Sequence, residues 1–313
     1  LQNWACKNAM DFVAISFVQS GDDVKFVRRI LDEAGGQNIK IISKIENEEG
    51  LINFDEILKY TDGVMVARGD LGMEIPSEKV PLAQKWMITK CNIAGKFVVT
   101  ATQMLESMCG NPLPTRAEMT DVSNAVFDGS DCVMLSGETA NGIDPPNACA
   151  TMAAIAANAE MGINYQQQVD FISDFTPRPT STLETTMSGA AKTAIETGAG
   201  LIVIKAESGH TANLISKYRP PCPILVITTS MDVARATTGH FGQYPCFVDE
   251  IGPDTQAFAL DYAVEKNYCG AGSMAVVVLG LEDHFTGNRV PSLTMVKVPG
   301  FLIPEKAQKT RST

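Results

Sequence analysis

The sequence is poor in histidine, with three among 313 residues, and its eight cysteines are scattered without a C-x-x-C pair. These scarcities argue against a zinc site and against a disulfide framework. No apolar run approaches the roughly 18 to 20 residues of a membrane span, and the first residues lack the basic start and apolar run of a secretory signal. We therefore expect a soluble, cytoplasmic protein whose cysteines are mostly reduced.

Positive charge is scarce as well. The 25 Lys and Arg against 36 Asp and Glu give a net charge of −11 and a pI near 4.8. Nucleic acids and anionic membranes need a basic surface, so we expect neither as a partner. An anionic small substrate would need a local cationic pocket or a metal ion. The length and the 45% hydrophobic content are sufficient for a buried core and two domains.

Short apolar runs alternate with helical patterns between residues 11 and 160, which predicts five strand–helix units. The runs are "DFVAISFV" (11–18), "IKIISKIE" (39–46), "DGVMVARGD" (62–70), "KFVVTATQ" (96–103) and "DCVMLSGE" (131–138). Segments between them, such as "DDVKFVRRILDEAG", have apolar residues at helical spacing and Gly near the end. Strands that alternate with helices form a parallel sheet with helical crossovers, so the fold class is α/β.

A stretch rich in Pro, Thr and Ser, "DFISDFTPRPTSTLE", follows a helix predicted over about 145–163 and is typical of a linker. We expect a first domain over 1–165, a linker over 166–182 and a smaller α/β domain over 183–313. The strands expected in the second domain are "LIVIKA", "CPILVITT", "PCFVD", "MAVVVLG" and "SLTMVKVP".

Each of the five strands in the first domain becomes polar at its C-terminal end. In "IISKIENEEG" (41–50), Lys44 and Glu46 share one strand face. The other strands end in Ser16, in Arg68 and Asp70, in Thr100 and Thr102, and in Ser136 and Glu138. Active sites of parallel strand–helix arrays lie at the carboxyl ends of the strands, so this pattern favours a catalytic rim.

Each of these residues has a structural interpretation when it is considered alone. Lys44 and Glu46 are equally typical of an ion pair at the end of a strand, and Asp70 is typical of an Asx turn. Ser136 and Glu138 are typical of a helix cap, and Thr100 and Thr102 are typical of strands in general. The recurrence of polar residues at five strand ends favours the catalytic interpretation.

Glu46 and Asp70 follow neighbouring predicted strands and suit Mg²⁺ or Mn²⁺, which take one or two carboxylates and complete their shell with substrate oxygens and water. Lys44 beside such a metal would neutralise charge on a transferring phosphoryl group or a developing enolate. The turn "VARGDLG" offers backbone N–H groups to a carboxylate. The predicted chemistry is metal-assisted handling of a small phosphorylated or carboxylated acid.

Five segments in the same order resemble the pyruvate kinase family: "IISKIENEEG", "DGVMVARGDLGMEIP", "TATQMLESM", "PTRAEMTDVSNAVFDGSDCVMLSGETANG" and "SKYRP". The resemblance runs from about residue 11 to the end and is strongest over 39–142. It implies a glycolytic transferase, a kinase that converts phosphoenolpyruvate and ADP into ATP and pyruvate by way of enolpyruvate. It further implies Mg²⁺ (or Mn²⁺), K⁺, ATP binding and a cytoplasmic homotetramer.

The resemblance also implies roles for single residues. Lys44 would stabilise the phosphoryl group in transfer and the enolate that remains. Glu46 and Asp70 would hold the divalent metal, and Ser16 and Phe17 would line the substrate pocket.

The substrate carboxylate would be held by the backbone of Ala67, Arg68 and Gly69 together with Thr102. A proton relay to the enolate carbon would complete the reaction. The residues implied in that relay are Thr102, Ser136 and Glu138.

A complete (β/α)8 barrel has eight strands in about 250 residues, so five strands predict a partial TIM barrel. The chain resembles the C-terminal part of the family, with barrel strands four to eight and the C-terminal domain. The substrate-binding Arg, the K⁺ ligands and much of the nucleotide site lie outside the resemblance, so we expect little activity from this chain alone. A non-catalytic regulatory or structural subunit and a metal-dependent lyase of a pyruvate-like enolate are the alternatives.

The C-terminal domain of the family often binds a sugar phosphate at a loop before a helix. The corresponding loop is "KAESGHTANL", and a second loop, "GLEDHFTGNRVPSL", departs from the effector-binding pattern. Glu207 opposes an anion here, and a helix N-cap by Ser208 or Thr211 is an equally consistent interpretation. The possible effector residues are Ser208, Gly209, His210, Thr211 and Arg289.

Overall fold

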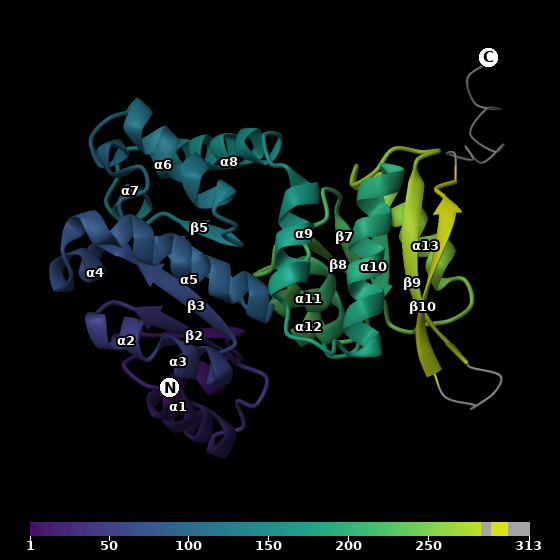
Figure 1. The fold of residues 1–313 in the computed structure, drawn as a ribbon, viewed down its shortest axis with the longest axis horizontal. Coiled ribbons are helices and arrows are strands. Elements are labelled where there is room, and N and C mark those ends of the chain that lie inside the picture. The colour runs from purple at the N-terminus through teal and green to yellow at the C-terminus, as the bar shows by residue number, and fades with distance from the viewer. Residues whose placement is uncertain (283–288, 300–313) are drawn as a thin grey trace, which may run out of the picture. The chain divides into compact units, whose positions relative to one another are not determined.

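A computed structural model describes residues 1–282 and 289–299 and divides the chain into two compact units (Figure 1). Unit 1 comprises Leu1–Thr176 with Gly239–Phe241, and unit 2 comprises Pro177–Thr238 with the chain from Gly242 onward. Each unit is an α/β layer with its own sheet.

Unit 1 contains a sheet of five parallel strands that pair in sequence order, as the sequence predicts. The strands are β1 (Phe12–Ile15), β2 (Lys40–Ile45), β3 (Gly63–Ala67), β4 (Phe97–Ala101) and β5 (Cys132–Met134). The helices are α1 (Gly21–Glu33), α2 (Glu48–Ile52), α3 (Phe54–Tyr60), α4 (Arg68–Glu74), α5 (Val80–Ala94), α6 (Arg116–Phe127), α7 (Gly137–Ala140), α8 (Pro145–Glu160) and α9 (Tyr165–Phe175). Short non-α turns are η1 (Gln2–Cys6), η2 (Ser77–Lys79) and η3 (Glu106–Cys109).

Alternation along β2 separates the core of unit 1 from its site. Ile41, Ser43 and Ile45 are buried, and the two isoleucines pack in one cluster with apolar residues of α1, α3 and α5. Ile42 and Lys44 lie on the opposite face, because successive side chains of a strand alternate. Ile45 of β2 is paired in register with Val66 of β3, so the polar residues that follow both strands emerge at the same edge of the sheet.

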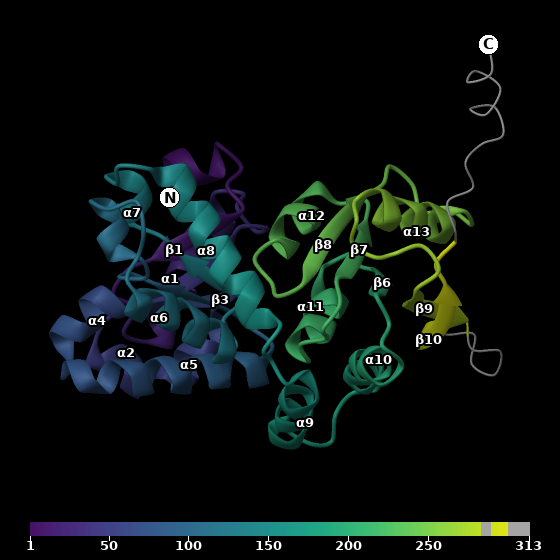
Figure 2. The same cartoon turned by 90° about the horizontal axis from the view of Figure 1, so that it is seen from above.

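Unit 2 contains a mixed sheet in the order β10-β9-β6-β7-β8, in which β9 and β10 are antiparallel and the other pairs are parallel. Its strands are β6 (Leu201–Lys205), β7 (Ile224–Thr228), β8 (Gln243–Phe247), β9 (Met274–Glu282) and β10 (Arg289–Lys297). Its helices are α10 (Thr182–Thr197), α11 (His210–Lys217), α12 (Met231–Thr237) and α13 (Thr255–Glu265). Figure 2 shows α10 and α11 on one side of these strands and α13 on the other, which agrees with the two clusters of buried residues.

The linker expected over 166–182 is wrong in its first part, because residues 165–175 form α9. The Asn164 side chain accepts a hydrogen bond from the Gln167 N–H at the start of this helix, and Val169 and Ile172 are buried on one face. The prediction of a linker relied on the average composition of the segment, but its Pro and Thr residues follow residue 175. The helical spacing of apolar residues before that point was therefore overlooked. The stretch outside helices is 176–181.

In the described ranges no helix combines the length and the apolar character that crossing a membrane requires.

Candidate functional site

The ends of β1 and β2 are joined by a buried carboxylate, that of Glu46. Its side chain is 0% exposed, and its Oε1 lies 2.7 Å from the Lys44 Nζ. Lys44 also donates a hydrogen bond of 2.9 Å to the Ser16 Oγ, and the Phe17 N–H donates to the Glu46 Oε2. Phe17 has a φ of 53°, an uncommon conformation for a residue other than glycine. The structure therefore brings Ser16, Phe17, Lys44 and Glu46 together at one edge of the sheet.

The Glu46 carboxylate has an incomplete set of partners. Within the described residues its Oε1 is buried and accepts no hydrogen bond, although the Lys44 ammonium lies at ion-pair distance. Buried polar atoms normally have hydrogen-bond partners, so this oxygen is available to another electropositive group. A divalent cation is such a group.

Asp70 supplies a second carboxylate. It lies in the first turn of α4, and within the described ranges its side chain has no hydrogen bond or ion pair. No group of three or more His, Cys, Asp or Glu side chains in that part of the chain forms a cage for a metal. Two carboxylates at neighbouring strand ends fit Mg²⁺ or Mn²⁺, because these ions take the remaining ligands from substrate and water.

The turn after β3 and the turn after β4 meet at Gly69 and Thr102. The Gly69 N–H donates a hydrogen bond of 2.7 Å to the Thr102 Oγ1, which in turn donates one of 2.6 Å to the Ala101 carbonyl. Thr102 itself has a φ of 69°. The N–H group that was expected to receive a substrate carboxylate therefore already faces the Thr102 hydroxyl.

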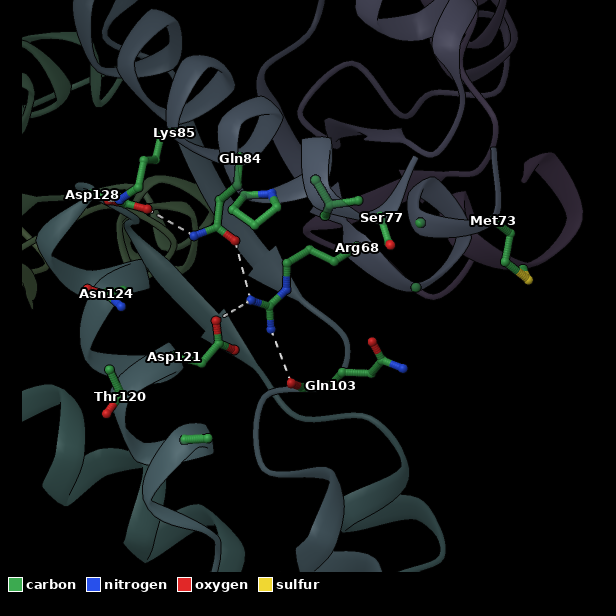
Figure 3. Close-up of a pocket in the computed structure, with 15 residues that line it drawn as sticks. Arg68, Met73, Ser77, Gln84, Lys85, Gln103, Thr120, Asp121, Asn124 and Asp128 are labelled. Atoms are coloured by element: carbon green, nitrogen blue, oxygen red, sulfur yellow. Dashed lines mark hydrogen bonds and ion pairs between the residues drawn. The ribbon is translucent and has the colours of Figure 1, made fainter. Parts of the chain in front are cut away.

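The Arg68 side chain reaches past the end of β4, where it donates to the Thr102 carbonyl at 2.7 Å, and lines a cleft of about 650 Å³ between α4, α5 and α6 (Figure 3). The Arg68 side chain is 10% exposed, and its guanidinium lies 2.7 Å from an Asp121 carboxylate oxygen. It also donates to the Gln84 Oε1 at 3.3 Å. The sequence analysis did not identify Asp121 or Gln84, although "PTRAEMTDVSNAV" contains the former.

Glu138 is a buried residue whose two carboxylate oxygens are both in use. The Leu105 N–H donates to its Oε1 at 3.0 Å and the Ser136 N–H to its Oε2 at 2.7 Å. These contacts tie the turn after β4 to the turn after β5. Ser136 precedes α7 but makes no side-chain cap, and Thr100 is buried against the Ser130 hydroxyl at 2.8 Å.

Glu118 organises the segment that leads into α6. Its carboxylate accepts hydrogen bonds from the N–H and the hydroxyl of Ser107 (2.7 and 2.6 Å) and of Thr115 (2.7 and 2.8 Å). Burial alone would raise the pKa of Glu118, but the hydrogen bonds from Ser107 and Thr115 outweigh burial and lower the pKa below its ordinary value.

We expect Glu118→Gln to lower the free energy of unfolding of the chain by about 1 to 2 kcal/mol at neutral pH, because hydrogen bonds to a charged acceptor are lost. Because the pKa of Glu118 is lowered in the folded state, its stabilising contribution is fully present above the unfolded pKa of about 4.3. The contribution is lost as the pH falls through the folded-state pKa. Urea unfolding at several pH values measures the difference in the free energy of unfolding between the variant and wild type. Glu78→Gln, at an exposed position of η2, is the control, and a loss that persists unchanged in acid would contradict the prediction.

The possible effector loop of unit 2 begins α11 without a side-chain cap. Gly209 is the N-cap residue with a φ of 79°, and no hydroxyl caps the helix, so the alternative of a cap by Ser208 or Thr211 is wrong. Lys205 forms an ion pair of 2.9 Å with Glu207. Residues 283–288 of the second loop segment lie outside the described residues, and Arg289 is placed only by its position at the start of β10.

Comparison with known proteins identifies two matching family profiles. "Pyruvate kinase, barrel domain" matches residues 2–149, and "Pyruvate kinase, alpha/beta domain" matches residues 184–289.

Individual relatives agree with these matches. A pyruvate kinase of Eimeria tenella is 50% identical over 287 residues, which are 91% of this chain and 54% of the relative. One of Clostridium acetobutylicum is 44% identical over 91% of this chain and 60% of its own length. The solved structure of Cryptosporidium parvum pyruvate kinase in complex with ADP superimposes with a TM-score of 0.90 at 47% identity, over 95% of this chain and 61% of that chain. The chain thus spans between half and two thirds of the length of these relatives.

Proposed function

Because the chain belongs to the pyruvate kinase family, we propose that unit 1 carries part of a site that transfers the phosphoryl group of phosphoenolpyruvate to ADP, giving ATP and pyruvate. The observation that carries this proposal is the buried Glu46 oxygen without a hydrogen bond beside the Lys44 ammonium. The net charge of −11 repels an anionic substrate at long range, so a local cation such as Lys44 or a bound metal is needed to attract it.

In this proposal Glu46 and Asp70 hold Mg²⁺ or Mn²⁺. The bound metal would act as a Lewis acid toward phosphate and enolate oxygens. Lys44 places a fixed positive charge at the same edge, and its hydrogen bond to Ser16 and ion pair with Glu46 restrict where the ammonium lies. Preorganised charge of this kind stabilises a transition state with little reorganisation.

The substrate carboxylate would bind at the backbone of residues 67–69, where the first turn of α4 presents N–H groups. Thr102 would yield the Gly69 N–H to the carboxylate or share it, and its hydroxyl is the proposed proton donor of the relay. Ser136 remains a proposed member of that relay. We assign Glu138 a structural role instead, because both of its oxygens accept backbone N–H groups.

The finer properties of the protein rest on family membership. They are the use of K⁺, the binding of ADP and ATP, assembly into a homotetramer and a cytoplasmic location. The structural neighbour in complex with ADP supports the nucleotide. Regulation by a sugar phosphate at residues 208–211 has the weakest support, since the Lys205 ammonium there is paired with Glu207.

The test is an assay of pyruvate and ATP formation from phosphoenolpyruvate and ADP with Mg²⁺ and K⁺. We expect little turnover from the 313-residue chain alone and restored turnover when the part of the Eimeria tenella relative that it does not span is added as a second polypeptide. No turnover and no phosphoenolpyruvate binding in either mixture would favour the non-catalytic subunit. Consumption of phosphoenolpyruvate without ATP would favour a different reaction at the same metal.

A further inference from the structure

The turn after β4 has an uncommon backbone conformation. Thr102 and Gln103 are consecutive residues other than glycine with φ values of 69° and 53°. The left-handed conformation is unfavourable for a residue with a side chain, so two such residues in succession persist only when surrounding contacts hold them. Thr102 is one of the residues placed in the proposed substrate site.

Arg68 makes the contacts that hold this turn. Its Nη2 donates to the Thr102 carbonyl at 2.7 Å and to the Gln103 carbonyl at 3.3 Å. Its Nε donates to the carbonyls of Ala101 and Thr102 at 3.3 and 3.2 Å. One planar guanidinium thus binds three successive carbonyls, which a lysine ammonium lacks the geometry to do.

Asp121 and Gln84 in turn hold Arg68 from the far side of the cleft (Figure 3). Both accept from the Nη1 group, Asp121 at 2.7 Å and Gln84 at 3.3 Å. Gln84 is itself held by a hydrogen bond of 3.0 Å to Asp128. With 10% of its side chain exposed, Arg68 has little freedom to adopt another rotamer.

We propose that Arg68, locked by Asp121, is a positioning residue that sets the Thr102 hydroxyl against the Gly69 N–H. This inference rests on the proposed function, because the Arg68–Asp121 pair would set the geometry of the proposed binding site for the substrate carboxylate. Asp121 belongs to α6 and lies 53 residues from Arg68, so the helix after β4 takes part in the site without a contact to substrate.

The first experiment is independent of activity. Amide hydrogen exchange of the 313-residue chain is measured for wild type, Asp121→Asn and the control Asp55→Asn, which breaks the exposed Lys90–Asp55 ion pair instead. We expect the Gly69 amide to exchange at least about tenfold faster in Asp121→Asn, with the amides of β3 unchanged in both variants. Equal protection of Gly69 in all three proteins would overturn the inference.

The second experiment is a double-mutant cycle with Thr102→Val in the mixture in which wild type turns over. We expect Asp121→Asn to lower kcat/KM for phosphoenolpyruvate about 10- to 100-fold, and less than about twofold when Thr102→Val is already present. We expect Arg68→Lys to lower kcat/KM as Asp121→Asn does, so that a retained positive charge alone does not preserve the wild-type value. Equal losses in both backgrounds would indicate a general structural effect and overturn the inference. Absence of turnover in wild type, even with Gly69 protection lost in the variant, would overturn the proposed function and with it the catalytic part of the inference.

Discussion

Replacement of Lys44 by methionine is expected to lower the rate of pyruvate formation by about 10³- to 10⁵-fold. Removal of a cation that stabilises charge on a transferring phosphoryl group has an effect of this size in other phosphoryl transferases. In this chain the Lys44 ammonium is held in one position by its hydrogen bond to Ser16 and its ion pair with Glu46, and methionine supplies neither contact.

The measurement for Lys44→Met is steady-state turnover of the mixture with the second polypeptide, at saturating phosphoenolpyruvate, ADP, Mg²⁺ and K⁺. Lys90→Met is the matched control, because Lys90 forms an ion pair with Asp55 on the helical side of unit 1. Since loss of Lys44 leaves a buried carboxylate unpaired, the unfolding transition of the variant is recorded as well. A folded Lys44→Met protein with more than about a tenth of the wild-type rate would contradict the role assigned to Lys44.

Glu46→Gln is expected to lower the affinity for Mn²⁺ by at least about 100-fold, because the ion loses a charged oxygen ligand at a site with only two carboxylates. The amide retains an oxygen that can accept the Phe17 N–H, so the turn after β1 keeps its contact. Titration of Mn²⁺ by electron paramagnetic resonance measures the change.

Glu138→Gln is the matched control for the metal site. Glu138 is as deeply buried as Glu46, with 0% exposure for both, but its two oxygens already accept backbone N–H groups. We expect this variant to lose stability and to keep its Mn²⁺ affinity within about threefold of wild type. Equal losses of Mn²⁺ affinity in both variants would show that burial of a carboxylate, and not an oxygen without a hydrogen bond, decides the binding.

Both sheets were predictable because alternation of apolar strands with amphipathic helices is a local signal. The α9 helix was missed for a local reason as well, since Pro177 and Pro179 are close enough to dominate the composition of its C-terminal flank. The alternative of a helix cap by Ser208 or Thr211 is wrong because Gly209 is the N-cap residue and takes the left-handed conformation that this turn needs.

The sequence by itself determined the succession of strands along the chain, the parallel pairing in unit 1 and the identity of the polar residues at the strand ends. These features follow from the spacing of apolar residues and from the position of each segment along the chain. In a parallel sheet the last residues of every strand lie at the same edge. Only the tertiary structure decided how those polar residues are used. The contacts of Arg68 with Asp121, and of Glu138 with Leu105, join residues 53 and 33 positions apart, and no local pattern encodes a partner at that separation. Packing of the strand-end turns against one another gave both oxygens of Glu138 a backbone N–H partner and left one oxygen of Glu46 with the Lys44 ion pair but without a hydrogen bond.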